Sequence, residues 1–326
     1  MSTRKTIPTP AQPSKPSPDI KPSPDNLSPL KAIEPPNPNP NQPTPQGTPP
    51  LKELVKQYDS VSLLLQGGGA LGAYQAGIYE GLHKQGIKID RISGISIGAL
   101  NTAIIAGNRP ENRLAALQGF WNTITHRNYT PAGMNVYRQT ANELDKLSKI
   151  DMVSHFMPWI FENGFLKQQL RVMESTAEAW QTMIEGQRGF FKPRYFVPYD
   201  TTPNHLSYYT TDKLRETLER YCDLKLVNDV NRMKVSVSAV NVRNGNFAIF
   251  SNENEELHYD HFIASGALPP GFPAVEIDGE YYWDGGLVSN TPLNEILSHE
   301  EQLKQLIFQV DLWNAKGTVP ENMMEI

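Results

Sequence analysis

The sequence has 326 residues, of which 39% are hydrophobic and 20% charged, so it is long enough to bury a full core in one large α/β domain. The formal net charge of -5 argues against nucleic acid as a partner, because phosphate binding draws on clustered Lys and Arg. A single cysteine, Cys222, excludes an intrachain disulfide and a cysteine-based metal cage. No segment approaches about 18 uninterrupted apolar residues and no apolar stretch follows the basic N-terminus, so we expect neither a membrane span nor a Sec-type signal. These features favour a cytoplasmic protein and leave peripheral membrane contact open.

The N-terminal segment is unusually rich in proline, since residues 1–50 hold 16 of the 27 prolines. Lys15-Pro16-Ser17-Pro18-Asp19 is nearly repeated at residues 21–25. Such a stretch has too little apolar bulk to offset its ordering entropy, so we predict a disordered, partly polyproline-II tail over residues 1–55. A recognition segment for an SH3-like partner is the functional alternative to a plain linker.

The domain that follows, predicted over residues 60–313, begins with two strand-turn-helix units. An apolar strand from Ser60 to Leu65 runs into Gly67-Gly68-Gly69, and apolar residues from Leu71 to Leu82 then follow a helical spacing. The second unit has a strand over residues 87–93, a turn over residues 94–98 and a helix over residues 99–106. Strands that alternate with helices imply a mainly parallel sheet covered on both faces.

The remaining elements continue this pattern after one interruption. Residues 127–205 break the alternation and are interpreted as a helical and irregular insertion. Later strands are predicted over residues 234–240, 247–251, 275–283 and 305–311, and helices over residues 111–124, 212–222 and 292–299.

A nucleophile motif joins the second predicted strand to the second helix. Gly94-Ile95-Ser96-Ile97-Gly98 matches G-x-S-x-G, in which both glycines remove side chains that would clash at a sharp turn. The following helix points its N-terminal amides at the serine and favours developing negative charge there. Ser96 is therefore the candidate nucleophile, and a merely structural tight turn is the alternative.

The triple glycine before the first helix is the second candidate element. Backbone amides of Gly67, Gly68 and Gly69 could hold an oxyanion or a phosphate. The spacing departs from the dinucleotide fingerprint G-x-G-x-x-G, and no Gly-Lys-Ser/Thr follows that would make a Walker loop. We interpret it as an oxyanion loop, with a close-packing turn as the alternative.

The third element is Asp284, which ends a predicted strand and precedes Gly285-Gly286. At the end of a parallel strand its carboxylate would project at the same sheet edge as Ser96 and could act as the general base. Burial beside Tyr281, Tyr282 and Trp283 would raise the pKa of a carboxyl group there. Alone, this residue could also be an ordinary turn-forming aspartate.

Taken together and in this order, these motifs resemble those of the patatin-like phospholipases. The longer strings at residues 66–79 (QGGGALGAYQAGIY), 94–101 (GISIGALN) and 189–194 (GFFKPR) are similar to a bacterial branch of that family with an extra C-terminal segment. The resemblance covers about residues 61–311. It implies a three-layer α/β/α lysophospholipase-like fold and a Ser-Asp dyad. Leu71 occupies a position at which the family usually has Arg or Lys.

The seven histidines offer little support for a Ser-His-Asp triad or a metal site. Only His299 follows Asp284, beside Glu300 and Glu301 at a predicted helix end, where a solvated or capping histidine is common. The others are scattered without ligand spacing, so we expect no metal and no organic cofactor.

The predicted activity is hydrolysis of lipid acyl esters by Ser96 and Asp284, with the amides of Gly67 to Gly69 holding the oxyanion. A catalytically silent lipid- or partner-binding protein on the same fold, and an acyltransferase, are the alternatives. In the insertion, the apolar run over residues 156–161 is interpreted as core, or as a lid or membrane-docking surface.

Overall fold

The computed structural model describes residues 50–125, 182–195, 202–293, 296–297 and 304–313. The proline-rich residues 1–49, the apolar run at 156–161, most of the insertion and His299 lie outside the described residues. The predicted tail extended too far, because Leu51–Val55 forms the short helix α1, and its Leu51 and Val55 side chains pack against the hydrophobic core.

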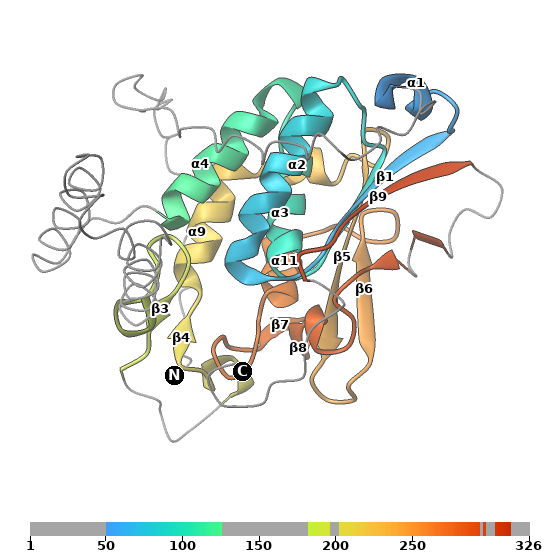
Figure 1. The fold of residues 1–326 in the computed structure, drawn as a ribbon. Coiled ribbons are helices and arrows are strands. Elements are labelled where there is room, and N and C mark those ends of the chain that lie inside the picture. Colours follow the sequence, from blue (N-terminus) through green and yellow to red (C-terminus); the bar gives the residue numbers. More distant parts are fainter. Residues whose placement is uncertain (1–49, 126–181, 196–201, 294–295, 298–303, 314–326) are drawn as a thin grey trace, which may run out of the picture. The chain divides into compact units, whose positions relative to one another are not determined.

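A mixed seven-stranded sheet organises the domain (Figure 1). Its order is β7-β8-β5-β2-β1-β9, with β6 paired to β5, and the four strands from β5 to β9 in this order are parallel. The strands are β1 Ser60–Leu65, β2 Arg91–Gly94, β5 Lys234–Asn241, β6 Phe247–Ser251, β7 Val275–Ile277, β8 Glu280–Asp284 and β9 Gln305–Val310. Leu63, Leu64 and Leu65 are all fully buried, so β1 is covered on both faces. The predicted α/β class, with a mainly parallel sheet flanked by helices, is confirmed.

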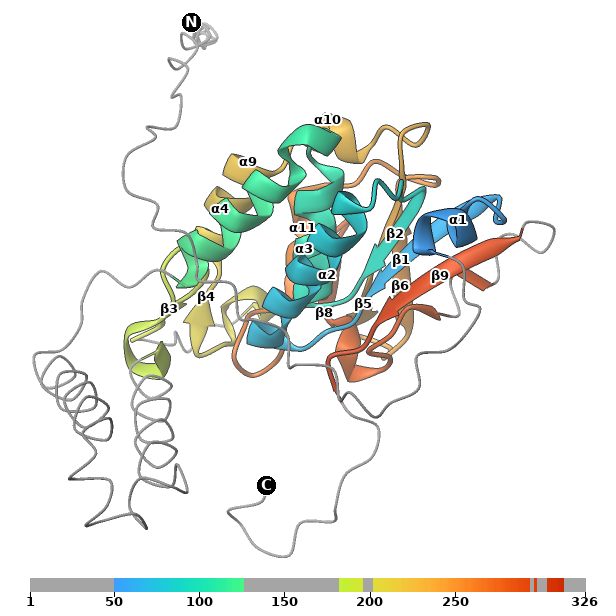
Figure 2. The same cartoon turned by 45° about the horizontal axis from the view of Figure 1, so that its top comes forward.

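Figures 1 and 2 show the longer helices of the domain gathered beside this sheet. They are α2 Gly72–Lys84, α3 Ile97–Ala106, α4 Arg113–Thr125, α9 Asp212–Tyr221 and α11 Tyr259–Ser265. Helix α3 contacts β1, β2 and β5 on one side and α2, α4 and α9 on the other. This explains why all ten of its residues are buried and why its sequence, IGALNTAIIA, is so small and apolar. No helix in the described part of the chain is long and apolar enough to cross a membrane.

The structure also contains several shorter elements. They are the 3-10 turns η1 Gly69–Leu71, η2 Pro110–Asn112, η3 Pro203–His205 and η4 Gly285–Leu287, the helix α10 Leu224–Val227, and the two-stranded sheet of β3 Lys192–Pro193 with β4 Tyr209–Thr210.

Two of the predicted strands were wrong in part. Residues 275–283 form a hairpin rather than one strand, because Asp278 and Gly279 adopt positive φ angles of 52° and 82° and turn the chain between β7 and β8. Strand β2 begins at Arg91 and not at Ile87. Ile87 and Ile89 are buried without joining the sheet, so their apolar character was misread as strand.

The pairing of β5 with its neighbours shows on which edge of β5 the strand β8 lies. β6 pairs with residues 236–240 of β5, and β2 pairs with residues 234–237, so these two neighbours must occupy opposite edges. β8 pairs with residues 239–241, which overlap the β6 positions, so β8 shares an edge with β2. Along one edge of β5, the chain of β2 is therefore followed by the chain of β8.

This arrangement brings the ends of two strands together. Gly94 pairs with Val237, and Asp284 pairs with Ala239, two residues further along β5. Because β8 is antiparallel to β5, it runs toward the end of β2 and its last residue arrives where β2 leaves the sheet. Asp284 thus reaches Ser96 from an antiparallel strand, whereas the sequence predicted a parallel one.

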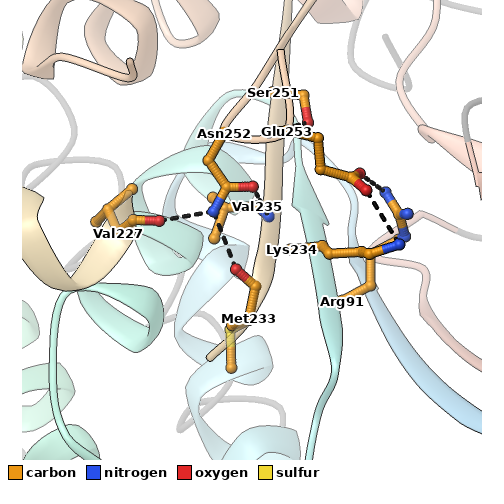
Figure 3. Close-up of polar contacts among 8 residues, drawn as sticks. All are labelled: Arg91, Val227, Met233, Lys234, Val235, Ser251, Asn252 and Glu253. Atoms are coloured by element: carbon orange, nitrogen blue, oxygen red, sulfur yellow. Dashed lines mark hydrogen bonds and ion pairs between the residues drawn. The ribbon is translucent and has the colours of Figure 1, made fainter. Parts of the chain in front are cut away.

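The opposite, amino-terminal end of the parallel strands carries a polar network (Figure 3). The Glu253 carboxylate binds Arg91 at 2.7 Å and Lys234 at 3.0 Å, and Arg91 is only 3% exposed although it is charged. The Asn252 side chain accepts from the Val235 amide and donates to two carbonyl groups, those of Val227 and Met233. These contacts tie β2 and the start of β5 to the loop after β6.

Candidate active site

Ser96 lies on a strained turn between β2 and α3. Its φ of 55° and ψ of -124° place a non-glycine residue in a sparsely populated region, as in a nucleophile elbow. A Cβ atom at Gly94 would overlap the Gly98 carbonyl, and one at Gly98 would overlap the Leu65 carbonyl. Both glycines of the motif are thus needed for close backbone packing, as the sequence predicted.

The turn is also held from outside by the end of α11. The Ser96 amide donates to the carbonyl oxygen of Ser265 at 3.1 Å and lies 3.0 Å from its Oγ. Sequence reasoning missed Ser265, since α11 has seven residues and offers too short a pattern to detect.

Asp284 is 3% exposed and lies beside this turn. Burial raises the pKa of Asp284 to about 6, although hydrogen bonds from the Ser96 side chain and the Gly286 amide act in the opposite direction. The Gly286 amide lies 2.7 Å from Asp284 Oδ1, and the Asp284 amide donates to the Ala267 carbonyl. The structure therefore brings the two predicted catalytic side chains into hydrogen-bond contact, and it holds both the carboxylate and the backbone of Asp284 by further hydrogen bonds.

The glycine-rich loop lies against the same serine. A Cβ atom on Gly67 would come within 3.0 Å of Ser96 Cβ. The Gly67 amide already donates to the Asn290 carbonyl at 3.4 Å, whereas the amides of Gly68 and Gly69 donate to no described residue. Of the three predicted oxyanion donors, the last two are therefore available for a ligand.

Two side chains that the sequence analysis did not select hold this loop. The Gly67 carbonyl accepts from Asn290 Nδ2 at 2.9 Å and from Trp313 Nε1 at 3.1 Å. Because a trans peptide unit is planar, fixing this carbonyl also fixes the direction of the Gly68 amide. Asn290 and Trp313 are thus positioning residues, and nothing local in the sequence marks them.

A buried chain of amides supports the loop from the helix side. The Gln66 carbonyl accepts from Gln75 of α2 at 2.6 Å, and Gln75 accepts from Asn101 of α3 at 2.9 Å. Asn101 in turn accepts from Trp121 of α4. Gln75 and Asn101 are both 0% exposed, so the two central side chains of this network, which links three helices to the loop, do not contact water.

The histidines that the structure describes do not join this site. His261 is buried and accepts from the His258 amide, at the start of α11 rather than at its end. Burial lowers the pKa of His261, so a neutral ring is favoured. Among the described residues, no three His, Cys, Asp or Glu side chains form a group that could hold a metal ion.

The fold and the site define an α/β protein with a serine on a nucleophile elbow beside a buried carboxylate. The family described as "Patatin-like phospholipase" matches residues 63–297. The chain therefore belongs to the patatin-like phospholipase family.

Similar curated proteins match only a short part of the chain. "Lysophospholipase nte1" of Aspergillus terreus is 53% identical over 47 residues, which are 14% of this chain and 3% of that protein. "Neuropathy target esterase sws" of Drosophila persimilis is 43% identical over 51 residues, 16% of this chain and 4% of that protein. The chain thus covers a very small share of these relatives.

Solved structures with some likeness include VipD from Legionella pneumophila, with a TM-score of 0.37 and 17% identity over 77% of this chain and 49% of that one. The ExoU-SpcU complex of Pseudomonas aeruginosa has a TM-score of 0.22 and 16% identity, over 64% of this chain and 36% of that one.

Proposed function

We propose that this protein hydrolyses carboxylic esters of lipids, with Ser96 as the nucleophile and Asp284 as its general base. The observation that carries this proposal is the hydrogen bond between the Ser96 side chain and a buried carboxylate, on a turn with the strained geometry of a nucleophile elbow. No described histidine stands between the two residues.

Asp284 suits this role because of its raised pKa. A carboxylate with the ordinary pKa near 4 is a weak base toward an alcohol, whereas one with a pKa of about 6 is more basic and still ionised at neutral pH. As Ser96 Oγ attacks the ester carbonyl, Asp284 takes the hydroxyl proton. Negative charge passes from the carboxylate to the former carbonyl oxygen.

The Gly68 and Gly69 amides, together with the N-terminus of α3, would stabilise that oxyanion. When the tetrahedral intermediate collapses, the bond to the alcohol breaks and the leaving oxygen takes the proton from Asp284. The fatty acyl group remains on Ser96 as an ester. Water then attacks this ester, with Asp284 again as base, and releases the fatty acid.

A lipid substrate is proposed from the family and from the printed name of one relative, a lysophospholipase. The exposed apolar side chains beside the site agree with it. Fatty acyl chains are apolar and need such a surface to leave water.

The proposal is tested with a fluorophosphonate probe, which forms a covalent bond only with an activated serine. Wild type should label and should release fatty acid from an ester panel, and Ser96→Ala should lose both. Ser62→Ala is the matched control, since Ser62 is a buried serine of β1 whose Oγ has no hydrogen-bond partner.

Each possible outcome separates the alternatives. Unlabelled but folded wild type would favour a silent binding protein. Labelling followed by transfer of the acyl group to an added alcohol in preference to water would favour an acyltransferase. Undiminished labelling of Ser96→Ala would remove Ser96 as the nucleophile.

A further inference from the structure

Large apolar side chains are exposed around the candidate active site. They lie on the segments that carry or contact Ser96, Asp284 and Gly67, and we call them the apolar rim: Leu71, Tyr74, Leu268, Leu287, Val288 and Trp313. Solvated apolar groups in one place are unfavourable unless something covers them, so a cluster at a site usually marks an interaction surface.

Hydrogen bonds place the members of the apolar rim next to the catalytic groups. Trp313 donates to the Gly67 carbonyl, and the Leu71 amide donates to the Gly68 carbonyl. Leu268 follows Ala267, whose carbonyl accepts from the Asp284 amide. Leu287 and Val288 belong to the turn that begins at Asp284. Five of the six members of the rim therefore belong to segments that adjoin the site.

The same segments lack positive charge. Residues 66–72, 94–98, 265–274 and 284–293 contain one charged residue in total, Asp284, and no Lys or Arg. The segment 311–313 adds a second acidic residue, Asp311, beside Trp313. The charge close to the site is thus acidic, in line with the formal net charge of -5 for the whole sequence.

The backbone of Tyr208 separates that of Arg194, a basic residue of the described insertion, from the loop that carries Leu268. The Tyr208 carbonyl accepts from the Arg194 amide, while the Tyr208 amide donates to the Pro270 carbonyl. Residue 208, just before β4, therefore stands between Arg194 and the loop that carries Leu268. No cation of the described residues belongs to the apolar rim itself.

We propose that the apolar rim docks on an uncharged lipid surface and that the site takes neutral acyl esters, such as acylglycerols, in preference to anionic phospholipids. This proposal rests on the proposed function. Binding to a lipid surface gains free energy from buried apolar area and, for anionic lipids, about 1 kcal/mol from each nearby Lys or Arg. Among the described residues of these segments only the first contribution is present, and the exposed carboxylate of Asp311 opposes an anionic surface.

Binding is tested first, with the full-length Ser96→Ala chain so that no lipid is consumed. It should float with phosphatidylcholine vesicles containing diacylglycerol at least as strongly as with vesicles in which phosphatidylglycerol replaces the diacylglycerol. Leu287→Ser with Val288→Ser should weaken that binding about tenfold, because exposed apolar area is lost. Val230→Ser should not, since Val230 is similarly exposed but precedes the amino-terminal end of β5.

Substrate preference is tested second, with wild type and with diacylglycerol or phosphatidylglycerol in micelles of one uncharged detergent. Diacylglycerol should be cleaved faster. Val288→Lys should raise the rate on phosphatidylglycerol relative to diacylglycerol about fivefold, the factor that corresponds to one added cation. Val230→Lys should leave this ratio unchanged. Because a ratio is measured, partial misfolding of a variant does not imitate the effect.

The inference and the proposed function fail in different ways. Faster cleavage of phosphatidylglycerol by wild type, or stronger flotation of the Ser96→Ala chain with anionic vesicles, would overturn only the inference, provided that Ser96 of wild type labels with the probe. So would a chain that floats with neither vesicle and whose dimer is broken by Val288→Ser, because the rim would then cover a second copy. Absence of labelling would overturn the proposed function itself.

Discussion

Two carboxylates at opposite ends of the sheet have opposite electrostatic environments. At the amino-terminal end, burial alone would raise the pKa of Glu253, but hydrogen bonds and charges of Lys234 and Arg91 outweigh it and hold the pKa below the ordinary value (Figure 3). At the carboxyl-terminal end, burial raises the pKa of Asp284 to about 6, and no cation of the described residues compensates. One carboxylate is paired, and the other is left basic.

The difference has opposite consequences for stability. Glu253 has a lowered folded-state pKa, so its contribution is present above the ordinary carboxyl pKa and is lost as the pH falls through the lowered one. Asp284 has a raised folded-state pKa, so its ionisation destabilises the fold as the pH rises from about 4 to about 6. The paired Glu253 thus stabilises the domain at neutral pH. Ionised Asp284 destabilises it, and the same ionised group is the proposed base.

Asp284→Asn should have the largest effect, because it removes the uncompensated carboxylate at the carboxyl-terminal end of the sheet. The amide keeps the shape but cannot accept the serine proton, so kcat/KM should fall by about 10² to 10⁴-fold. The free energy of unfolding at pH 8 should rise, by on the order of 2 kcal/mol, because a buried uncompensated charge is removed. Ester hydrolysis and urea unfolding measure the two effects.

His299→Ala is the control for the catalytic part of this prediction. In a dyad it should change activity little, whereas in a triad the loss of the histidine should be at least as damaging as the loss of the acid. A strong loss of activity in a folded His299→Ala chain would contradict the dyad.

Glu253→Gln, at the other end of the sheet, should lower stability and leave activity unchanged. It removes the negative charge that faces the buried Arg91, so the free energy of unfolding should fall by about 1–3 kcal/mol at neutral pH. The activity of the folded fraction should stay the same, since Glu253 contacts no residue of the site. Loss of activity without loss of stability would show that the two ends are coupled.

Trp313→Phe should have a smaller effect, on the carboxyl-terminal end alone. It keeps an aromatic ring but removes the donor to the Gly67 carbonyl, so kcat should fall several-fold, as for one hydrogen bond of about 1 kcal/mol, with KM little changed. Tyr208→Phe removes a hydroxyl for which no bond to a described residue is found, and it should leave kcat unchanged. A change confined to KM would instead assign Trp313 to substrate binding.

Local sequence patterns were sufficient for the turn at Ser96 and for most strands. Gly94 and Gly98 are required by backbone contacts within a few residues, or with the neighbouring β1, so a short motif carries the information. The strands β1, β5, β6 and β9 were predicted within a residue or two, because short runs rich in apolar residues mark them.

Long-range pairing could not be read from the sequence. The Asp278-Gly279 turn is a hairpin signal, and the prediction of residues 275–283 as one strand, which left this turn out, made β8 parallel. The roles of Ser265, Asn290 and Trp313 depend on contacts with residues far away in the chain. Such contacts follow from the sheet order and leave no local pattern.

The pH dependence of fluorophosphonate labelling tests the central claim, that Asp284 activates Ser96, most directly. The labelling rate constant requires ionised Asp284, so it should rise with an apparent pKa of about 6 and then level off. The same midpoint should be found in His299→Ala, and Asp284→Asn should give a slow rate without that transition. A midpoint that is unchanged in Asp284→Asn, or that disappears in a single histidine variant, would contradict the account.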